Sequence, residues 1–280
     1  MKHIKRSLLA IFVVTAVVSC KKDEPKPMPA PVQTGSVKLE FQHNYQDAPL
    51  DLDGEYTMPP PHAQKLQFKR FSYIISDITL IKANGEEVSY HHTNPDKGAF
   101  LVIQQGKQAP PSVTLERIPF GEYTKIKFRL GISNEAWKLG QGKQSAFWSA
   151  AQKAGMAWAW ERGYKHTNFE GTWAENGTPA DTHPFGFHLT SKLSGMVDDS
   201  MIFTRDFATD LQDYSSQTLI IADEKVKNIR FDVNASSIFG GKNKIQLTEQ
   251  NAQQSDTNTS LYPKIKENMA MGLFKVASIY

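Results

Sequence analysis

Apolar and polar residues alternate from residue 37 to residue 45. Val37, Leu39, Phe41, His43 and Tyr45 fall on one face, and the residues between them are polar. Because successive side chains of a strand point to opposite faces, this pattern predicts a half-buried strand with His43 near its end. A histidine on an apolar face is ordinarily a buried residue that bonds to a nearby polar group, and this is the simplest interpretation of His43 on its own.

Further strands are predicted at regular spacing along the chain. Runs rich in β-branched and aromatic residues, separated by turn residues, occur at 66–82, 87–91, 100–103, 113–118, 125–132, 165–173, 185–189, 200–207, 217–222 and 228–233. Asn84-Gly85 is a hairpin signal between the first two runs. Short strands at this spacing, with few helical patterns among them, predict an all-β sandwich of the immunoglobulin-like or Greek-key type.

Helical patterns are few. Residues 144–154 suit a short helix that ends at Gly155, and 234–239 suit a helical turn. The polar run 240–260 predicts a mobile loop. Apolar residues then recur at helical spacing and predict a C-terminal helix over 264–279; they are Ile265, Met269, Leu273 and Val276.

The first 19 residues have the pattern of a secretory signal peptide. Positive residues precede an apolar run, 7–18, that is too short for a comfortable membrane span. The run ends in Val17-Val18-Ser19-Cys20, which resembles a bacterial lipobox, so Cys20 is predicted to be the lipid-modified first residue of the mature chain. Because Cys20 is the only cysteine, a disulfide framework is excluded.

Residues 20–35 form a proline-rich linker, in which alternating prolines favour extended polyproline II and predict a tether. One β-sandwich domain is then expected over 36–280. Residues 21–24 resemble a signal that sends some lipoproteins to the outer face of the outer membrane, and they equally suit a solvated charge run. We therefore expect an outer-membrane lipoprotein that faces the periplasm or the cell exterior. The net charge of +3, without a basic cluster, argues against nucleic-acid binding.

Two tryptophans stand two residues apart in the segment 155–171. If this segment is extended, Met156, Trp158 and Trp160 share one face, which is typical of a core strand. His188 belongs to the later run 185–189, on the face opposite to the two phenylalanines of that run. A polar residue in this position lines a pocket or faces solvent, and the pattern alone leaves both open.

Several segments, taken together and in order, resemble the MbnP-like copper-binding family. They are Leu39–His43, Phe71–Leu80, Ile118–Tyr123, Gly155–Trp160 with Gly163-Tyr164, and Phe187–Leu189. The resemblance implies an all-β periplasmic protein or lipoprotein that takes part in copper handling. It also implies Cu(I) held by two histidines and a kynurenine, which a di-haem peroxidase partner of the MauG type makes from a tryptophan.

Carried over by position, His43 and His188 match the family's histidines. Trp158 or Trp160 matches the tryptophan, and Tyr164 and Met156 are further candidates in the same segment. Imidazole suits copper, which stands at the top of the divalent affinity order. The chain departs from some members of the family in having no cysteine pair in the domain, and His166 stands where an aromatic residue is usual. No catalytic motif is present that would predict an enzyme.

Two other functions fit the same residues. Trp158, Trp160, Trp173 and Tyr164 could form a sugar-stacking platform on a carbohydrate-binding or adhesion module. Alternatively, the tryptophans belong to the core of a purely structural lipoprotein. Copper binding separates the first interpretation from both alternatives.

Overall fold

The folded part of the chain is a unit that extends from Val32 to Tyr280. The computed structural model describes residues 31–90, 93–106, 109–176, 178, 183–192, 197–198, 200–211, 217–254 and 261–280. The signal peptide, Cys20 and most of the linker predicted from the sequence lie outside these residues. Within them, no helix is long and apolar enough to cross a membrane.

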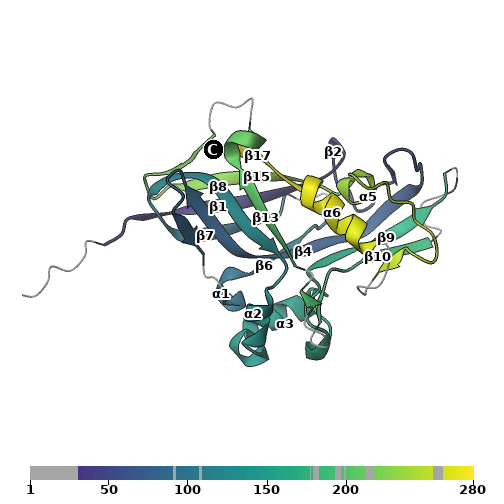
Figure 1. The fold of residues 1–280 in the computed structure, drawn as a ribbon, viewed down its shortest axis with the longest axis horizontal. Coiled ribbons are helices and arrows are strands. Elements are labelled where there is room, and N and C mark those ends of the chain that lie inside the picture. The colour runs from purple at the N-terminus through teal and green to yellow at the C-terminus, as the bar shows by residue number, and fades with distance from the viewer. Residues whose placement is uncertain are drawn as a thin grey trace, which may run out of the picture. The chain divides into compact units, whose positions relative to one another are not determined.

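The strands of the unit form two large sheets (Figure 1). The first contains, in spatial order, β17 (Phe274–Ile279), β15 (Val226–Asn234), β1 (Thr34–Tyr45) and β2 (Ala48–Pro49), and β7 (Ser112–Pro119) also pairs with β1. β1 and β15 run parallel, from Ser36 opposite Val226 to Asn44 opposite Asn234, whereas the other pairs are antiparallel.

The second sheet is the larger. It contains, in order, β13 (Met201–Asp206), β8 (Gly121–Leu130), β4 (Lys65–Lys82), β9 (Thr167–Ala174), β10 (His183–Phe187) and β16 (Gln253–Gln254). Four short strands pair with parts of its long strands. They are β14 (Leu219–Ile221), which pairs with β8, and β3 (Tyr56–Thr57), β5 (Glu87–Ser89) and β6 (Phe100–Ile103), which pair with β4. A separate hairpin joins β11 (Ser191–Lys192) to β12 (Val197–Asp198).

The two sheets pack face to face around one apolar core. Burial alternates along the whole of β1, so the face predicted from residues 37–45 is the face that is buried. Phe41 of β1 stacks on Phe231 of the parallel strand at 5.4 Å and meets Tyr73 of the other sheet edge-on at 6.1 Å. Burial of such aromatic side chains is a large favourable contribution to the free energy of folding. The predicted all-β sandwich is confirmed.

A small helical layer with its own core covers part of the second sheet. It contains α1 (Pro95–Gly98), α2 (Asn134–Lys138), η1 (Gln141–Lys143), α3 (Ser145–Lys153) and η2 (Trp160–Arg162), and its helices lie together beside β4 and β6 in Figure 1. Gln144 is fully buried there: its Nε2 donates to the Ala136 carbonyl at 2.9 Å, and its Oε1 accepts from Tyr164 Oη at 2.9 Å. The apolar side chains of this layer include Ile74, Ile132, Trp137, Phe147, Trp148, Met156 and Tyr164.

The C-terminal helix predicted over 264–279 is correct only in its first half. Helix α6 spans Tyr262–Gly272, and the chain then continues as β17, which pairs with β15. Phe274 and Val276 are buried on either side of an exposed Lys275, which is the two-residue period of a strand. The helical spacing of apolar residues therefore predicted the helix correctly, but it did not reveal the change to a strand after Gly272. Two further helices, α4 (Phe207–Asp210) and α5 (Ser237–Gly240), are each a single turn.

The polar run after α5 is a loop through residue 252, as predicted, and two of its side chains anchor it to the sandwich; residues 255–260 lie outside the described part of the chain. Ile245 and Leu247 are almost completely buried. The Gln64 side chain makes both hydrogen bonds that a neighbouring strand would make to Leu247. Its Oε1 accepts from the Leu247 amide at 2.8 Å, and its Nε2 donates to the Leu247 carbonyl at 2.9 Å. Side-chain pairing of this kind leaves no trace in the apolar pattern, so the sequence did not show where the loop is attached.

Candidate functional site

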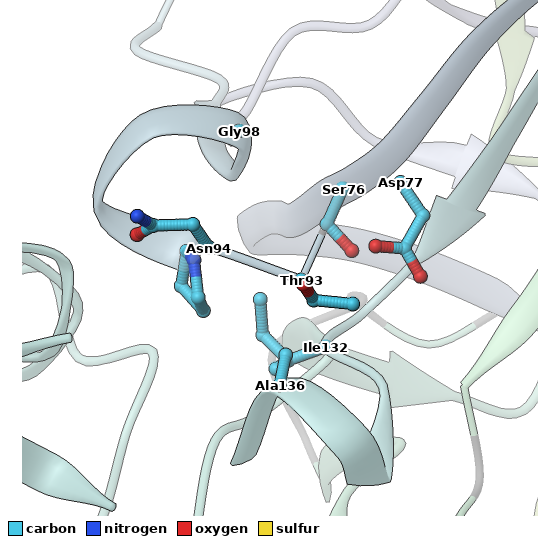
Figure 2. Close-up of a pocket in the computed structure, with 8 residues that line it drawn as sticks. Ser76, Asp77, Thr93, Asn94, Gly98, Ile132 and Ala136 are labelled. Carbon is cyan, nitrogen blue, oxygen red and sulfur yellow. The ribbon is translucent and has the colours of Figure 1, made fainter. Parts of the chain in front are cut away.

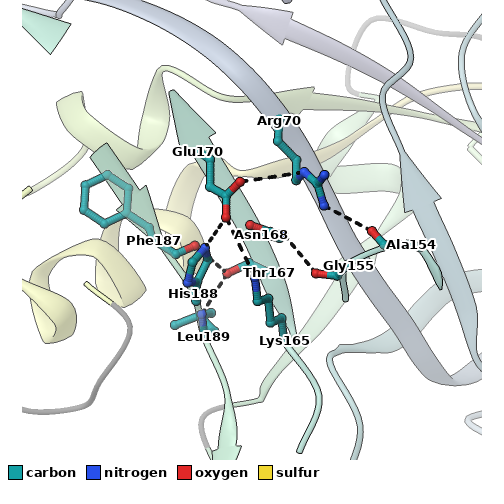
Figure 3. Close-up of polar contacts among 10 residues, drawn as sticks. All are labelled: Arg70, Ala154, Gly155, Lys165, Thr167, Asn168, Glu170, Phe187, His188 and Leu189. Carbon is teal, nitrogen blue, oxygen red and sulfur yellow. Dashed lines mark hydrogen bonds and ion pairs between the residues drawn. The ribbon is translucent and has the colours of Figure 1, made fainter. Parts of the chain in front are cut away.

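His188 is presented on the outer face of the larger sheet by the pairing of β9 with β10. Phe187 lies opposite Phe169 in this antiparallel pair, and both side chains belong to the core between the sheets. The next residue on each strand therefore points outward, which places His188 and Glu170 on the opposite face. There, His188 Nε2 lies 2.9 Å from Glu170 Oε1 (Figure 3).

Charged neighbours keep the Glu170 carboxylate ionised. The hydrogen bond from His188 is the largest contribution that lowers the pKa of Glu170, and Lys165 and Arg70 lower it further. Lys165 Nζ lies 3.8 Å from Oε1, and Arg70 Nε lies 3.7 Å from Oε2. Burial is the main cause that lowers the pKa of Lys165, and Glu170 opposes it.

Three acceptors on this outer face lack a hydrogen-bond partner among the described residues, namely Thr172 Oγ1 on β9 and two others. One of these two is Nδ1 of His188, which is buried while its Nε2 is bonded to Glu170. The other is Oδ1 of Asn168, a fully buried residue two positions before Glu170 on β9 and therefore on the same face. Buried polar atoms are usually paired, so three unpaired acceptors on one face suggest a group that is absent from the protein atoms.

The same outer face fixes the end of α3. Arg70 Nη1 donates to the carbonyl of Ala154 at 3.1 Å, and Asn168 Nδ2 donates to the carbonyl of Gly155 at 3.1 Å (Figure 3). Gly155 follows the helix with φ of +70°, and a Cβ there would lie 2.4 Å from Arg70 Nη1. The backbone conformation therefore favours glycine, and any other residue would also displace the end of the Arg70 side chain. The predicted helix end at this glycine is confirmed.

The tryptophan segment is not the extended strand that the alternation predicted. Beyond a bridge between Ala157 and Tyr164, the chain reverses through η2, and the Trp158 amide donates to the Gly163 carbonyl at 3.2 Å. Gly163 has φ of +76°, a conformation that side chains other than glycine rarely adopt. A reversal of this kind removes the two-residue period, so the two tryptophans enter different surroundings.

Trp158 lies beside His188. The two rings meet edge-on with centroids 5.8 Å apart, and Trp158 is half-buried. The Arg162 guanidinium and the Lys165 ammonium lie 4.9 and 5.0 Å from the centroid of the indole, within the range of cation–π attraction. This indole therefore borders the same polar cluster as His188, Glu170 and Lys165.

The other candidates of this segment belong to the helical layer. Trp160 packs against Trp148 at 4.7 Å and Trp137 at 5.8 Å between ring centroids. Met156 and Tyr164 are fully buried in the same apolar cluster. For these three candidates, the structure matches the interpretation in which the segment supplies core side chains.

His43 lies on the inner face of the sandwich and has both ring nitrogens occupied. Nδ1 is 2.6 Å from Gln104 Oε1, and Nε2 is 3.0 Å from Tyr73 Oη. Burial lowers the pKa of His43 to about 4. A surface pocket of about 290 Å³ reaches this histidine, and it is lined by Gln42, His43, Pro49, Leu50, Asp51, Gln104 and Pro110.

The larger sheet separates His43 from His188. The His43 ring packs on Phe71, which stacks on Phe169 at 4.3 Å on the inner face. Glu170, the next residue after Phe169, faces outward and holds His188. The structure thus brings His188 and Trp158 together, and it does not bring His43 to them.

A second polar pocket lies next to the helical layer, and it is much smaller than the pocket at His43. Ser76, Asp77, Thr93 and Asn94 line a space of about 10 Å³, enough for about one water molecule. Figure 2 shows the Asn94 amide pointing away from Ser76 and Asp77, and Asp77 is paired with Arg129 at 2.7 Å. Across the part of the chain that the structure describes, no group of three or more His, Cys, Asp or Glu residues could hold a metal ion.

Sequence reasoning missed Glu170, Arg70 and Asn168. Each lies on a predicted strand, but a charged or amide residue on an outward face is ordinarily solvated. Only the register between β4, β9 and β10 shows that these residues surround His188.

Fold and site together define an all-β sandwich that carries a histidine–carboxylate pair and a tryptophan on the outer face of one sheet. The family model for MbnP matches residues 34–260, and the chain belongs to the MbnP family. A solved structure of MbnP from Methylosinus trichosporium is similar, with a TM-score of 0.47, 13% sequence identity, and coverage of 82% of this chain and 88% of that chain. A comparison with curated proteins found no match.

Proposed function

We propose that this chain is an extracytoplasmic lipoprotein of copper handling that binds copper at His188, beside Trp158, on the outer face of the larger sheet. The observation that carries the proposal is the unpartnered Nδ1 of His188, whose other nitrogen is held by Glu170. Membership of the MbnP family indicates a copper-related role. No catalysis by the chain itself is part of the proposal.

The residues present fit a copper ion. An unprotonated imidazole nitrogen is a favoured copper ligand, and Nδ1 is the His188 nitrogen that the hydrogen bond to Glu170 leaves unpartnered among the described residues. Asn168 Oδ1 is a further unpartnered acceptor on this face within the described chain, but an amide oxygen suits harder cations than copper, so the imidazole is the donor on which the proposal rests. Intact indole offers a metal no lone pair, whereas kynurenine offers an aniline nitrogen and a ketone oxygen.

Trp158, rather than Trp160, is the tryptophan that the proposal assigns to oxidation. The sequence left both open, and the contact of Trp158 with His188 favours it. Trp160 is turned toward Trp148 in the helical layer. The oxidant is a di-haem peroxidase partner of the MauG type, as the family resemblance implies, and the chain is anchored in the outer membrane through Cys20.

His43 has a structural role in this proposal. Its ring nitrogens already bond to Gln104 and Tyr73, and a copper ion shared with His188 would have to bridge the sheet between them. The alternative sugar platform receives no support from this geometry. Trp173 is 3% exposed and Tyr164 is fully buried, so two of its four aromatic residues cannot stack on a glycan.

Copper affinity of single variants tests the proposal. Wild-type protein, His188→Ala and the control His183→Ala would be compared by competition with a Cu(I) chelator. His183 begins β10, the strand that His188 directly follows, and it also packs on a tryptophan, Trp173. We expect His188→Ala to weaken Cu(I) binding by at least about 100-fold, because even the partner of a metal-binding histidine is worth 10–100-fold. The His183 variant should bind like wild type, and an equal affinity of His188→Ala would refute the proposed site.

A further inference from the structure

The hydrogen bond between Glu170 and His188 determines which nitrogen of the imidazole is free. We propose that Glu170 is a positioning residue that fixes His188 in the tautomer protonated on Nε2, so that Nδ1 is the nitrogen offered to a metal. The tautomer is a property of the metal-free protein, whereas its consequence for the metal rests on the proposed function. Nothing in the sequence pattern of β9 distinguishes Glu170 from a solvated strand residue.

The chemistry of the pair requires this proton position. An ionised carboxylate only accepts hydrogen bonds, so the nitrogen 2.9 Å from Glu170 Oε1 must carry the hydrogen. In a neutral imidazole the other nitrogen then has a lone pair and no hydrogen. That nitrogen, Nδ1, is the buried atom that has no partner among the described residues.

The Glu170 carboxylate is itself held by the sheet. Arg70 Nε lies 3.7 Å from one oxygen and Lys165 Nζ lies 3.8 Å from the other. Arg70 also donates to the Ala154 carbonyl, at the end of the helix that leads into the Trp158 segment. One group of outer-face side chains therefore contacts both the His188 imidazole and the end of α3, from which the tryptophan segment continues (Figure 3).

The consequence for a metal follows from general coordination chemistry. A histidine that binds a metal through one nitrogen usually donates the hydrogen of the other to a carboxylate or carbonyl, and this fixes the ring and raises its basicity. Loss of such a partner typically lowers metal affinity by 10–100-fold. We therefore expect Glu170→Ala to weaken Cu(I) binding by about 10–100-fold, although Glu170 does not touch the metal.

The first measurement needs no metal. Long-range ¹H–¹⁵N correlation spectra of apo protein at alkaline pH report which ring nitrogen carries the hydrogen. Wild type should show His188 protonated on Nε2, and Glu170→Ala should show a mixture of the two tautomers. Glu170→Gln keeps a side-chain oxygen that can accept from Nε2, so it should retain much of the wild-type tautomer. Glu249→Ala is the control, because Glu249 Oε1 lies 3.4 Å from Nδ1 of another histidine, His183, in a more exposed pair.

The second measurement compares Cu(I) affinities of the same variants by chelator competition. The order expected is wild type and Glu249→Ala tightest, Glu170→Gln next, and Glu170→Ala weakest. An unchanged His188 tautomer in Glu170→Ala overturns the inference, as does unchanged affinity in Glu170→Ala when His188→Ala has lost it. If His188→Ala binds copper normally while the tautomer of Glu170→Ala shifts, the proposed function fails and the positioning role stands. If Glu170→Ala does not fold, the smaller change in Glu170→Gln decides by the same criteria.

Discussion

At the scale of single residues, His43 and His188 show how the face of a strand decides the role of a side chain. His43 is 1% exposed, and its partners are the neutral groups of Gln104 and Tyr73. His188 has a charged partner, Glu170, and one unpartnered nitrogen among the described groups. The sequence placed His43 on the apolar face and His188 on the opposite face from the phenylalanines, and both placements are confirmed. It could not show that the larger sheet lies between the two side chains, because His43 belongs to β1 of the smaller sheet and His188 follows β10 of the larger one.

Stability should fall in mild acid because of His43. Its pKa is about 4 in the folded chain, below the value near 6.5 of an unfolded histidine. Between these values the unfolded state binds more protons, so the free energy of unfolding decreases as pH falls from about 6.5 toward 4. The contribution amounts to about 3 kcal/mol over that range. Urea denaturation of wild type and His43→Gln at several pH values measures it, and equal pH slopes for the two proteins would contradict the assignment.

The alternation in β1 should be visible in stability. Phe41→Ala removes a ring packed on Phe231 and Tyr73 and should cost about 3–5 kcal/mol of unfolding free energy. Glu40→Ala, one position earlier, removes a partly exposed carboxylate paired with Lys38 and should cost about 1 kcal/mol or less. Denaturant titration of both variants measures the difference. Small and equal effects would show that this face is not the core.

At the scale of elements, prediction from the sequence succeeded where apolar residues kept one spacing along the chain, and it failed where that spacing changed. The strands of the sandwich and the end of α3 at Gly155 followed from local pattern. The turn at η2 separated Trp158 from Trp160, and the start of β17 cut the C-terminal helix at Gly272. At β17, pairing with the distant β15 overrides the local pattern, and a single sequence does not show that pairing. At η2, the reversal is local and follows from the left-handed Gly163 and the bridge between Ala157 and Tyr164.

Replacing the glycine that ends α3 should destabilise the protein. Gly155→Ala places a side chain at φ of +70° and a Cβ 2.4 Å from Arg70 Nη1, so we expect a loss of about 1–2 kcal/mol or more. Gly142→Ala is the control, because no atom lies within 4 Å of the added Cβ and its φ is not in the left-handed region. Thermal unfolding of the two variants compares them. Equal melting temperatures would mean that Arg70 moves without cost and does not clamp this helix end.

At the scale of the whole molecule, the proposal describes a membrane-tethered sandwich with a metal site on the outside of one sheet. Sheet architecture and family could be predicted from the sequence, since the order of its motifs and its strand spacing were sufficient. The arrangement of the candidate site could not, because Arg70, Asn168, Glu170 and His188 come from three strands and meet only through register.

The anchor is predicted to depend on one residue. Cys20→Ser should move the protein from the membrane fraction to the soluble fraction, because lipid attachment is the only membrane contact that the proposal includes. The melting temperature should not change, since Cys20 is the only cysteine and no disulfide is lost. Fractionation after a carbonate wash measures this, and a Ser variant that stays with the membrane would exclude the lipobox assignment.

The position of bound copper is the most direct test of the account. Crystals of copper-loaded protein, measured at the copper absorption edge, give an anomalous peak at the metal. The account predicts this peak about 2 Å from His188 Nδ1, the usual length of a metal–imidazole bond, on the side of the sheet that carries Glu170 and Trp158. A peak bonded to His43 in the interior, or one with His188 still unligated, would contradict it.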